Sequence, residues 1–202
     1  MNEQYMKKKK GLRGKPLKES LTYLVEVTDK EGNVIQRIEA PSRSFVQQWN
    51  QVVNVQAKQT ASTIKDTGGT NRSVNQSSDN LRIVSGAGVT NYGIRVGKGS
   101  TAVTISDYQL ESPLAHGTGL DQLNHLAMSS TPPQIADSTC SFTIRRNMLN
   151  ESGATISGIR EIGAYMRMGS YYGLAFRDVL PSAVYVPHGG SITVTYTIPV
   201  TV

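Results

Sequence analysis

SITVTYTIPVTV, residues 191–202, is the most regular segment of this 202-residue sequence. Large apolar side chains and threonines alternate along it, and a period of two is typical of a β-strand with one buried face. The segment therefore predicts a long strand of a β-sandwich. The side chains expected on its buried face are Ile192, Val194, Tyr196 and Ile198, and those on the other face are Thr193, Thr195 and Thr197.

Shorter β-rich runs precede this segment, separated by Gly, Pro, Asn and Asp. They lie at residues 92–96, 102–105, 141–145, 155–166 and 174–177. No helical pattern intervenes after residue 80, and the 19 glycines and the excess of Thr, Ser and Val over Leu argue against a helical bundle. Residues 81–202 are therefore expected to form an antiparallel β-sandwich, of jelly-roll or immunoglobulin-like type, in a mainly β protein.

A hairpin is expected within residues 19–41, because two β-rich runs flank DKEGN, in which Gly32 and Asn33 suit a tight turn. A helix is expected over residues 42–58, with Ser42 or Ser44 as its N-cap. Its packing anchors recur at spacings of three and four, which puts them on one face. These anchors are Phe45, Trp49, Val52 and Val53.

Residues 59–80 are almost entirely polar. Loops of this length inside compact domains are usually functional or disordered. We therefore expect a long polar loop here that reaches a neighbouring subunit.

The first 18 residues carry the whole net charge of the chain, which is +6 from 21 Lys and Arg against 15 Asp and Glu. A segment of this composition cannot bury itself and favours an acidic partner. An acidic protein surface, nucleic acid and a merely solubilising role all remain open. Tyr5 is the only aromatic residue within these 18 residues, so base-specific recognition of nucleic acid is not expected. The cations of this basic arm are Lys7, Lys8, Lys9, Lys10, Arg13, Lys15 and Lys18, against one anion, Glu3.

No cofactor, metal or catalytic site is expected, and the chain is not expected to be an enzyme. GIRVGKGST, residues 93–101, has the composition of a phosphate-binding loop but the wrong spacing, and a glycine turn between strands explains it better. The three histidines lack a metal-binding spacing. Asp107 and Glu111 are better explained as turn caps or partners of arginines than as an acid–base pair. Cys140, the single cysteine, excludes an internal disulfide and is expected to be inert.

No run approaches the eighteen or so consecutive apolar residues that a membrane helix needs. The basic start also lacks the apolar stretch of a secretion signal. These features predict a soluble protein that is made in the cytoplasm and has no membrane partner.

Three stretches carry distinctive motifs in a fixed order: YGIRVGKGSTAVTISDYQLESPLAHG (92–117), RNMLNESGATISGIREIGAYM (146–166) and FRDVLPSAVYVPHGGSITVTYTIPV (176–200). Together they resemble a group of tailed-bacteriophage structural proteins of about this size. In that group a V-G-x-G-x-x-A strand precedes D-Y-x-L, an N-x-S-G turn leads into a strand with E-I-G, and R-D-V-L precedes a final V-P-x-G strand. SFVQQW, residues 44–49, also fits the usual start, so the resemblance covers roughly residues 42–202 but not the basic arm.

The resemblance implies a virion component built on a β-sandwich and made in the host cytoplasm. The leading hypothesis is a head-associated or decoration subunit that forms a symmetric homo-oligomer and binds copies of itself and other virion proteins. A neck or tail component is the alternative within this class. Two alternatives belong to other classes of function. One is a nucleic-acid-binding protein that uses the basic arm. The other is a carbohydrate-binding module, which an aromatic-rich surface would favour; Tyr171 and Tyr172 are the only aromatic cluster in the sequence.

Overall fold

The computed structural model describes residues 18, 19, 21–42 and 44–201 and shows a mainly β protein, 52% strand, with one helix in that part of the chain. A nine-stranded sheet contains β3 (Val34–Ser42), β2 (Leu21–Thr28), β14 (Ser191–Thr201), β11 (Thr139–Leu149), β8 (Gln122–His125) and β7 (Ala115–His116), in that order. In addition, β1 (Lys18–Glu19) pairs with β14, and β9 (Ser129–Ser130) and β10 (Gln134–Ala136) pair with β11.

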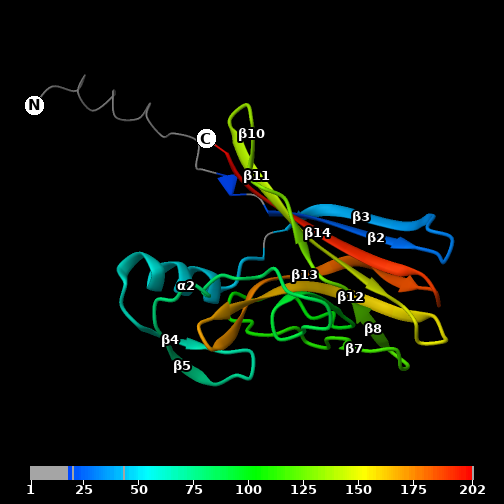
Figure 1. Ribbon diagram of the computed structural model, residues 1–202, viewed down its shortest axis with the longest axis horizontal. Coiled ribbons are helices and arrows are strands. Elements are labelled where there is room, and N and C mark those ends of the chain that lie inside the picture. Colours follow the sequence, from blue (N-terminus) through cyan, green and yellow to red (C-terminus); the bar gives the residue numbers. More distant parts are fainter. Residues whose placement is uncertain (1–17, 20, 43, 202) are drawn as a thin grey trace, which may run out of the picture.

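A second sheet has the order β13 (Tyr171–Val186), β12 (Ile156–Met168) and β6 (Gly93–Gly97), and a third is the hairpin of β4 (Ser62–Lys65) and β5 (Asn71–Val74). β7 and β8 pair in parallel, and the other pairings are antiparallel. The two larger sheets lie one over the other and share one core cluster (Figure 1). That cluster includes Val25 of β2 and Val194 of β14 from one sheet, and Ile162 of β12 and Phe176 of β13 from the other.

The alternation predicted for residues 191–202 is present in β14. Ile192, Val194 and Tyr196 are buried against the second sheet, and Ile198 is partly buried, while Thr195 and Thr197 are partly exposed. Thr193 departs from the prediction: it is buried, and its hydroxyl accepts a hydrogen bond from Asn147 Nδ2 (2.8 Å). β14 lies between β2 and β11, so its backbone is paired on both edges. The runs 92–96, 141–145, 155–166 and 174–177 also fall largely within strands, as expected.

The run 102–105 was wrongly predicted to be a strand. It is irregular in the structure, because Thr104 bonds to Asp107 through both its backbone N–H (3.1 Å) and its hydroxyl (2.6 Å). Such side-chain bonds to a carboxylate three residues away compete with pairing to a neighbouring strand.

The N-terminal hairpin of β2 and β3 is confirmed. Asp29 Oδ1 accepts hydrogen bonds from the backbone N–H groups of Glu31 (3.0 Å) and Asn33 (2.8 Å). Gly32 has φ of 88°, a backbone conformation that favours glycine. The predicted turn is therefore held by the carboxylate that precedes it.

The helix α2 (Gln47–Lys58) begins later than predicted, and neither serine caps it. Its N-cap is Val46, which makes no side-chain capping bond. Ser44 accepts a backbone hydrogen bond from Arg177 N–H (3.2 Å), and Val46 donates one to Ala175 (3.1 Å). The segment before the helix therefore pairs with β13. The carbonyl group of Ser44, which in an N-cap residue would accept the first hydrogen bond of the helix, accepts one from β13 instead.

Three of the four predicted anchors contribute to packing. Val52 is fully buried, and the partly buried Phe45 and Trp49 pack against the core, with their ring centroids 5.2 Å apart. Val53 is 40% exposed, whereas Val55, which shares the buried face with Val52, is fully buried. The anchor prediction at Val53 was wrong because the helix turns its buried face toward β13 and β4 through Val52 and Val55.

Residues 59–80 are not a continuous loop, because they contain the β4–β5 hairpin. Asp66 organises its turn: Oδ1 accepts the backbone N–H groups of Gly68 and Thr70, both at 2.9 Å, and Oδ2 accepts Arg72 Nε at 2.7 Å. Polar composition concealed these strands, because each contributes a single buried apolar side chain to the core, Ile64 in β4 and Val74 in β5. In the described ranges, no helix is long and apolar enough to cross a membrane.

Candidate functional site

A buried cluster of charged side chains joins the second sheet to the loop that follows β6. Arg177 of β13 donates through Nε to Glu161 of β12 (3.0 Å) and through one terminal nitrogen to Asp107 (2.9 Å), and its other terminal nitrogen lies 3.5 Å from Glu111. The side chains of Arg177 and Glu161 are 2% and 0% exposed. The prediction that Asp107 and Glu111 cap turns or meet arginines is confirmed.

Glu161 is also the anchor for the backbone of this loop. Its carboxylate accepts N–H groups from Gly99 (3.2 Å), Glu111 (3.0 Å) and Ser112 (2.6 Å). Glu111 in turn accepts the N–H and hydroxyl groups of Thr101, both at 2.9 Å. Two carboxylates thus hold both ends of the segment 99–112 against the sheet.

The glycines of the motifs permit this close approach. A Cβ on Gly97 would overlap both the carboxylate of Glu161 and the carbonyl oxygen of Ser112. A Cβ on Gly163 would lie 2.8 Å from both Leu110 Cδ2 and the carbonyl oxygen of Phe176. Gly97 and Gly99 of GIRVGKGST therefore allow close packing around the buried carboxylate of Glu161, and phosphate binding is not needed to explain them.

The charges of the cluster stabilise one another. Burial alone would raise the pKa of Asp107, but hydrogen bonds from Thr104 and Arg177 outweigh it and lower that pKa. Burial likewise opposes the charge of Arg177, whose pKa is nevertheless raised by its bonds to Glu161 and Asp107. Hydrogen bonds from Thr101 lower the pKa of Glu111. These shifts favour the charged forms of Asp107, Glu111 and Arg177, whose polar groups are bonded to partners inside the protein.

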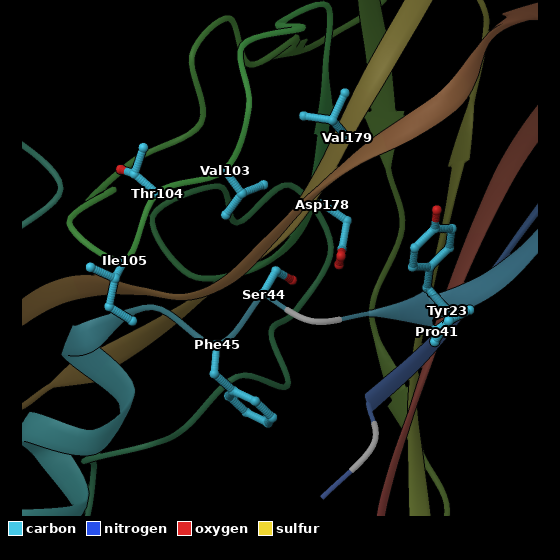
Figure 2. A pocket seen from close by; sticks show the side chains of 9 residues that line it. All are labelled: Tyr23, Pro41, Ser44, Phe45, Val103, Thr104, Ile105, Asp178 and Val179. Atoms are coloured by element: carbon cyan, nitrogen blue, oxygen red, sulfur yellow. The ribbon is translucent and has the colours of Figure 1, made fainter.

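A cavity of about 460 Å³ lies beside this cluster, between the end of β3, the start of α2, the segment 103–105 and β13 (Figure 2). Figure 2 shows the carboxyl of Asp178 directed toward Ser44 in its wall. Asp178 Oδ2 accepts hydrogen bonds from Ser42 Oγ (2.8 Å) and the hydroxyl of Tyr196 (3.1 Å). The two serines that failed to cap α2 thus form a buried network with this acid.

Burial raises the pKa of Asp178, although hydrogen bonds from Ser42, Ser44 and Tyr196 act in the opposite direction. The cavity combines this acid with the hydroxyls of Tyr23 and Ser44 and with the apolar side chains of Phe45 and Ile105. Such a wall can accept a hydrogen-bond donor from a ligand or a neighbouring chain.

A second buried cation, Arg146 of β11, was not singled out from the sequence. It is 0% exposed and donates to the carbonyl oxygens of Leu126 (3.0 Å), Ile94 (3.1 Å) and Val89 (2.8 Å). The sequence indicated its burial in one way: Arg146 alternates with Ile144 and Met148, which places all three on the same, core-facing side of a strand. Burial, followed by the charges of Arg146 and Arg95, lowers the pKa of the neighbouring His125 to about 3.

Most of the predicted basic arm lies outside the described residues, including Lys7, Lys8, Lys9, Lys10, Arg13 and Lys15. Lys18 is the first residue of β1, opposite Thr201 of β14. Within the ranges that the structure describes, no group of three or more His, Cys, Asp or Glu side chains is arranged to hold a metal ion.

Comparisons of the chain with protein-family models, with curated proteins and with solved structures find no match. The resemblance to bacteriophage structural proteins therefore stays a prediction. What the chain does is inferred below from its residues and their geometry.

Proposed function

We propose that this protein is a structural subunit of a bacteriophage virion, head-associated or decorating the head, that acts through contacts with other subunits. It performs no turnover, and it is made in the host cytoplasm and resides in the virion. One observation carries the proposal. The motif residues of the three stretches that resemble phage proteins meet at the cluster around Arg177 and Glu161.

Each motif supplies one part of that cluster. The V-G-x-G strand contributes Gly97, D-Y-x-L contributes Asp107 and the following Glu111, E-I-G contributes Glu161, and R-D-V-L contributes Arg177. The D-Y-x-L leucine, Leu110, also donates its backbone N–H to the hydroxyl of Tyr165 (2.8 Å). Each motif alone is a common turn sequence, but in the folded chain all of them contribute to one cluster. This supports reading the three stretches together as one resemblance.

The polar groups of this constellation are bonded to one another, which suits a rigid structural unit. Arg177 and Glu161 have their charges satisfied inside the protein, whereas a catalytic centre keeps groups free for a substrate. The shared core between the two larger sheets supports an antiparallel β-sandwich as the rigid body. Contacts with partners then fall to the exposed edges and to the basic arm.

The basic arm is proposed to bind an acidic surface on a neighbouring virion protein. The rest of the chain is neutral overall, so it offers no excess of positive charge to extend a nucleic-acid footprint. Seven cations on one segment are suited to an acidic seam between subunits.

Retention on particles tests the proposal. A variant with Lys7, Lys8, Lys9 and Lys10 replaced by Ala is expected to be retained on purified virions less than the parent, with an unchanged circular dichroism spectrum. Lys30→Ala combined with Lys58→Ala removes two exposed charges from the body and is the control for charge loss outside the arm, expected to be retained like the parent.

Absence of the parent protein from purified particles would refute the virion assignment. If the parent instead binds bare duplex DNA with a log–log salt slope of about −4.5 to −6, the arm is a nucleic-acid-binding element, since five to seven phosphate contacts release that many counterions.

A further inference from the structure

The cavity beside the charged cluster has a polar floor and an apolar rim. Asp178 and Ser44, at its floor, are 7% and 4% exposed. Pro41 and Ile105, at its rim, are both exposed. Figure 2 shows Ile105 and Pro41 on opposite sides, with Asp178 between them. The volume of about 460 Å³ lies within the range of small-molecule sites. A ligand that enters from solvent therefore passes apolar side chains before it reaches the carboxyl group.

The carboxyl group of Asp178 has acceptor capacity that its protein partners do not use. Its Oδ2 accepts hydrogen bonds from Ser42 Oγ (2.8 Å) and from the hydroxyl of Tyr196 (3.1 Å). Ser44 Oγ lies 2.7 Å from Ser42 Oγ and belongs to the same network. Both bonds to Asp178 use one oxygen, and a carboxylate has about four lone-pair sites on its two oxygens. Oδ1 is therefore available to a donor in the cavity.

No positive charge pairs with this carboxyl group within the described ranges. Arg177, its neighbour along β13, points to the opposite face of the strand and pairs with Glu161 and Asp107. Burial raises the pKa of Asp178, and the hydroxyl groups around it oppose that rise. A buried carboxylate without a counter-charge is costly, and a bound cation would reduce that cost.

Two aromatic rings line the same cavity. Figure 2 shows the ring of Phe45 on the side of Ile105 and the ring of Tyr23 on the side of Pro41. The faces of aromatic rings attract organic cations. A hydrated metal ion is a poorer match, because hard cations need several oxygen ligands and much of this wall is apolar. The lining therefore favours a cation that carries an apolar stem.

We infer that this cavity binds a primary ammonium group on an aliphatic stem, with the ammonium at Oδ1 of Asp178 and the stem along Phe45 and Ile105. A guanidinium fits less well, because its paired donors need both carboxylate oxygens and Oδ2 already accepts two hydroxyl groups. An anion meets no positively charged group among the described residues of the lining. The ammonium belongs either to a free alkylamine or to a lysine side chain of another protein.

Purified protein tests the inference, which does not depend on the proposed role in a virion. Hexylamine, which is protonated at about pH 7, is the probe. Isothermal titration calorimetry is expected to show saturable binding at one site per chain. Hexan-1-ol and hexanoate have the same chain length but are neutral and negative. Each should bind about 30-fold more weakly or worse, because it lacks the charge-assisted hydrogen bond.

Two variants test the acid and the rim separately. Asp178→Asn keeps the shape of the side chain and should weaken hexylamine binding by about 30-fold or more. Asp137→Asn is its matched control, since Asp137 is exposed in the β10–β11 turn, outside the cavity. Ile105→Trp narrows the rim and leaves the acid intact, so it should weaken binding without changing the melting temperature. Leu120→Trp is the control for it, because Leu120 is 76% exposed and lies outside the cavity.

A lysine analogue, Nα-acetyl-lysine N-methylamide, separates the two sources of the ammonium. Binding as tight as that of hexylamine identifies a partner's lysine as an occupant, and much weaker binding identifies a free amine. Either result supports an ammonium site.

Arg43 lies outside the described residues, and Arg43→Ala should bind hexylamine like the parent. Tighter binding by Arg43→Ala would mean that the chain itself supplies the cation, and would overturn the inference. So would a parent without saturable binding, equal binding of hexan-1-ol, or an Asp178→Asn protein that binds like the parent. Because retention on virions is measured separately, either proposal can fail while the other stands.

Discussion

Glu161→Gln tests the central cluster, because it removes one charge while preserving the shape of the side chain. Glu161 is fully buried, pairs with Arg177 Nε at 3.0 Å and accepts three backbone N–H groups from the segment 99–112. The amide of glutamine has one acceptor oxygen, and its NH₂ group faces donors where a carboxylate oxygen stood. The variant therefore leaves Arg177 and at least one backbone donor without their charged acceptor.

The expected loss of stability is about 3 kcal/mol. Removing one partner of a buried ion pair costs about 3 to 5 kcal/mol. Arg177 keeps its contacts with Asp107 and Glu111, so the lower end applies here. In a domain of this size 1 kcal/mol corresponds to about 2 to 4 °C, so the melting temperature should fall by about 6 to 12 °C.

Urea unfolding followed by circular dichroism measures this change, and calorimetry measures the melting temperature. Glu151→Gln is the control, since Glu151 is exposed and accepts a hydrogen bond from Asn124; it should change stability by less than about 0.5 kcal/mol. Arg177→Gln alone and Arg177→Gln combined with Glu161→Gln complete a double-mutant cycle that isolates the pair. If Glu161→Gln is as stable as the control, the cluster does not hold the loop and the reasoning is wrong.

Three further predictions concern the same core. Gly97→Ala should destabilise the protein by about 1 to 3 kcal/mol in urea unfolding, because the new methyl group overlaps the carbonyl oxygen of Ser112, which cannot rotate away; an unchanged midpoint would contradict this. Burial first, and then nearby arginines, lower the pKa of His125 to about 3. Between pH 6.5 and 3, therefore, the unfolded chain binds a proton at this histidine and the folded chain does not. The contribution of His125 to the free energy of unfolding falls by about 1.4 kcal/mol per pH unit as the pH drops from 6.5 toward 3. His125→Gln should remove that part of the stability–pH profile, and a profile as steep as the parent's would count against it. Burial raises the pKa of Asp178, so its favourable contribution is present below pH 3.8 and lost as the pH rises through the folded value; Asp178→Asn should therefore gain stability relative to the parent as the pH is raised, and a difference independent of pH would exclude this.

The sequence alone determined the features that depend on neighbouring residues. The period of two in 191–202 identified β14, and Gly32 with Asn33 identified the turn between β2 and β3. Both are local, since a strand face and a tight turn are specified by side chains within a few positions of each other. The expected role of Asp107 and Glu111 also held, although their arginine was not identified.

The tertiary structure alone decided which residues meet across the chain. Ser42 and Ser44 are suitable N-caps by residue type, but they serve Asp178, 136 positions from Ser42. Arg177 lies 70 positions from Asp107 and 16 from Glu161. Hydrogen bonds and ion pairs are short-ranged, so the same side chain serves a cap or a distant acid according to which partner the folded chain brings within about 3 Å.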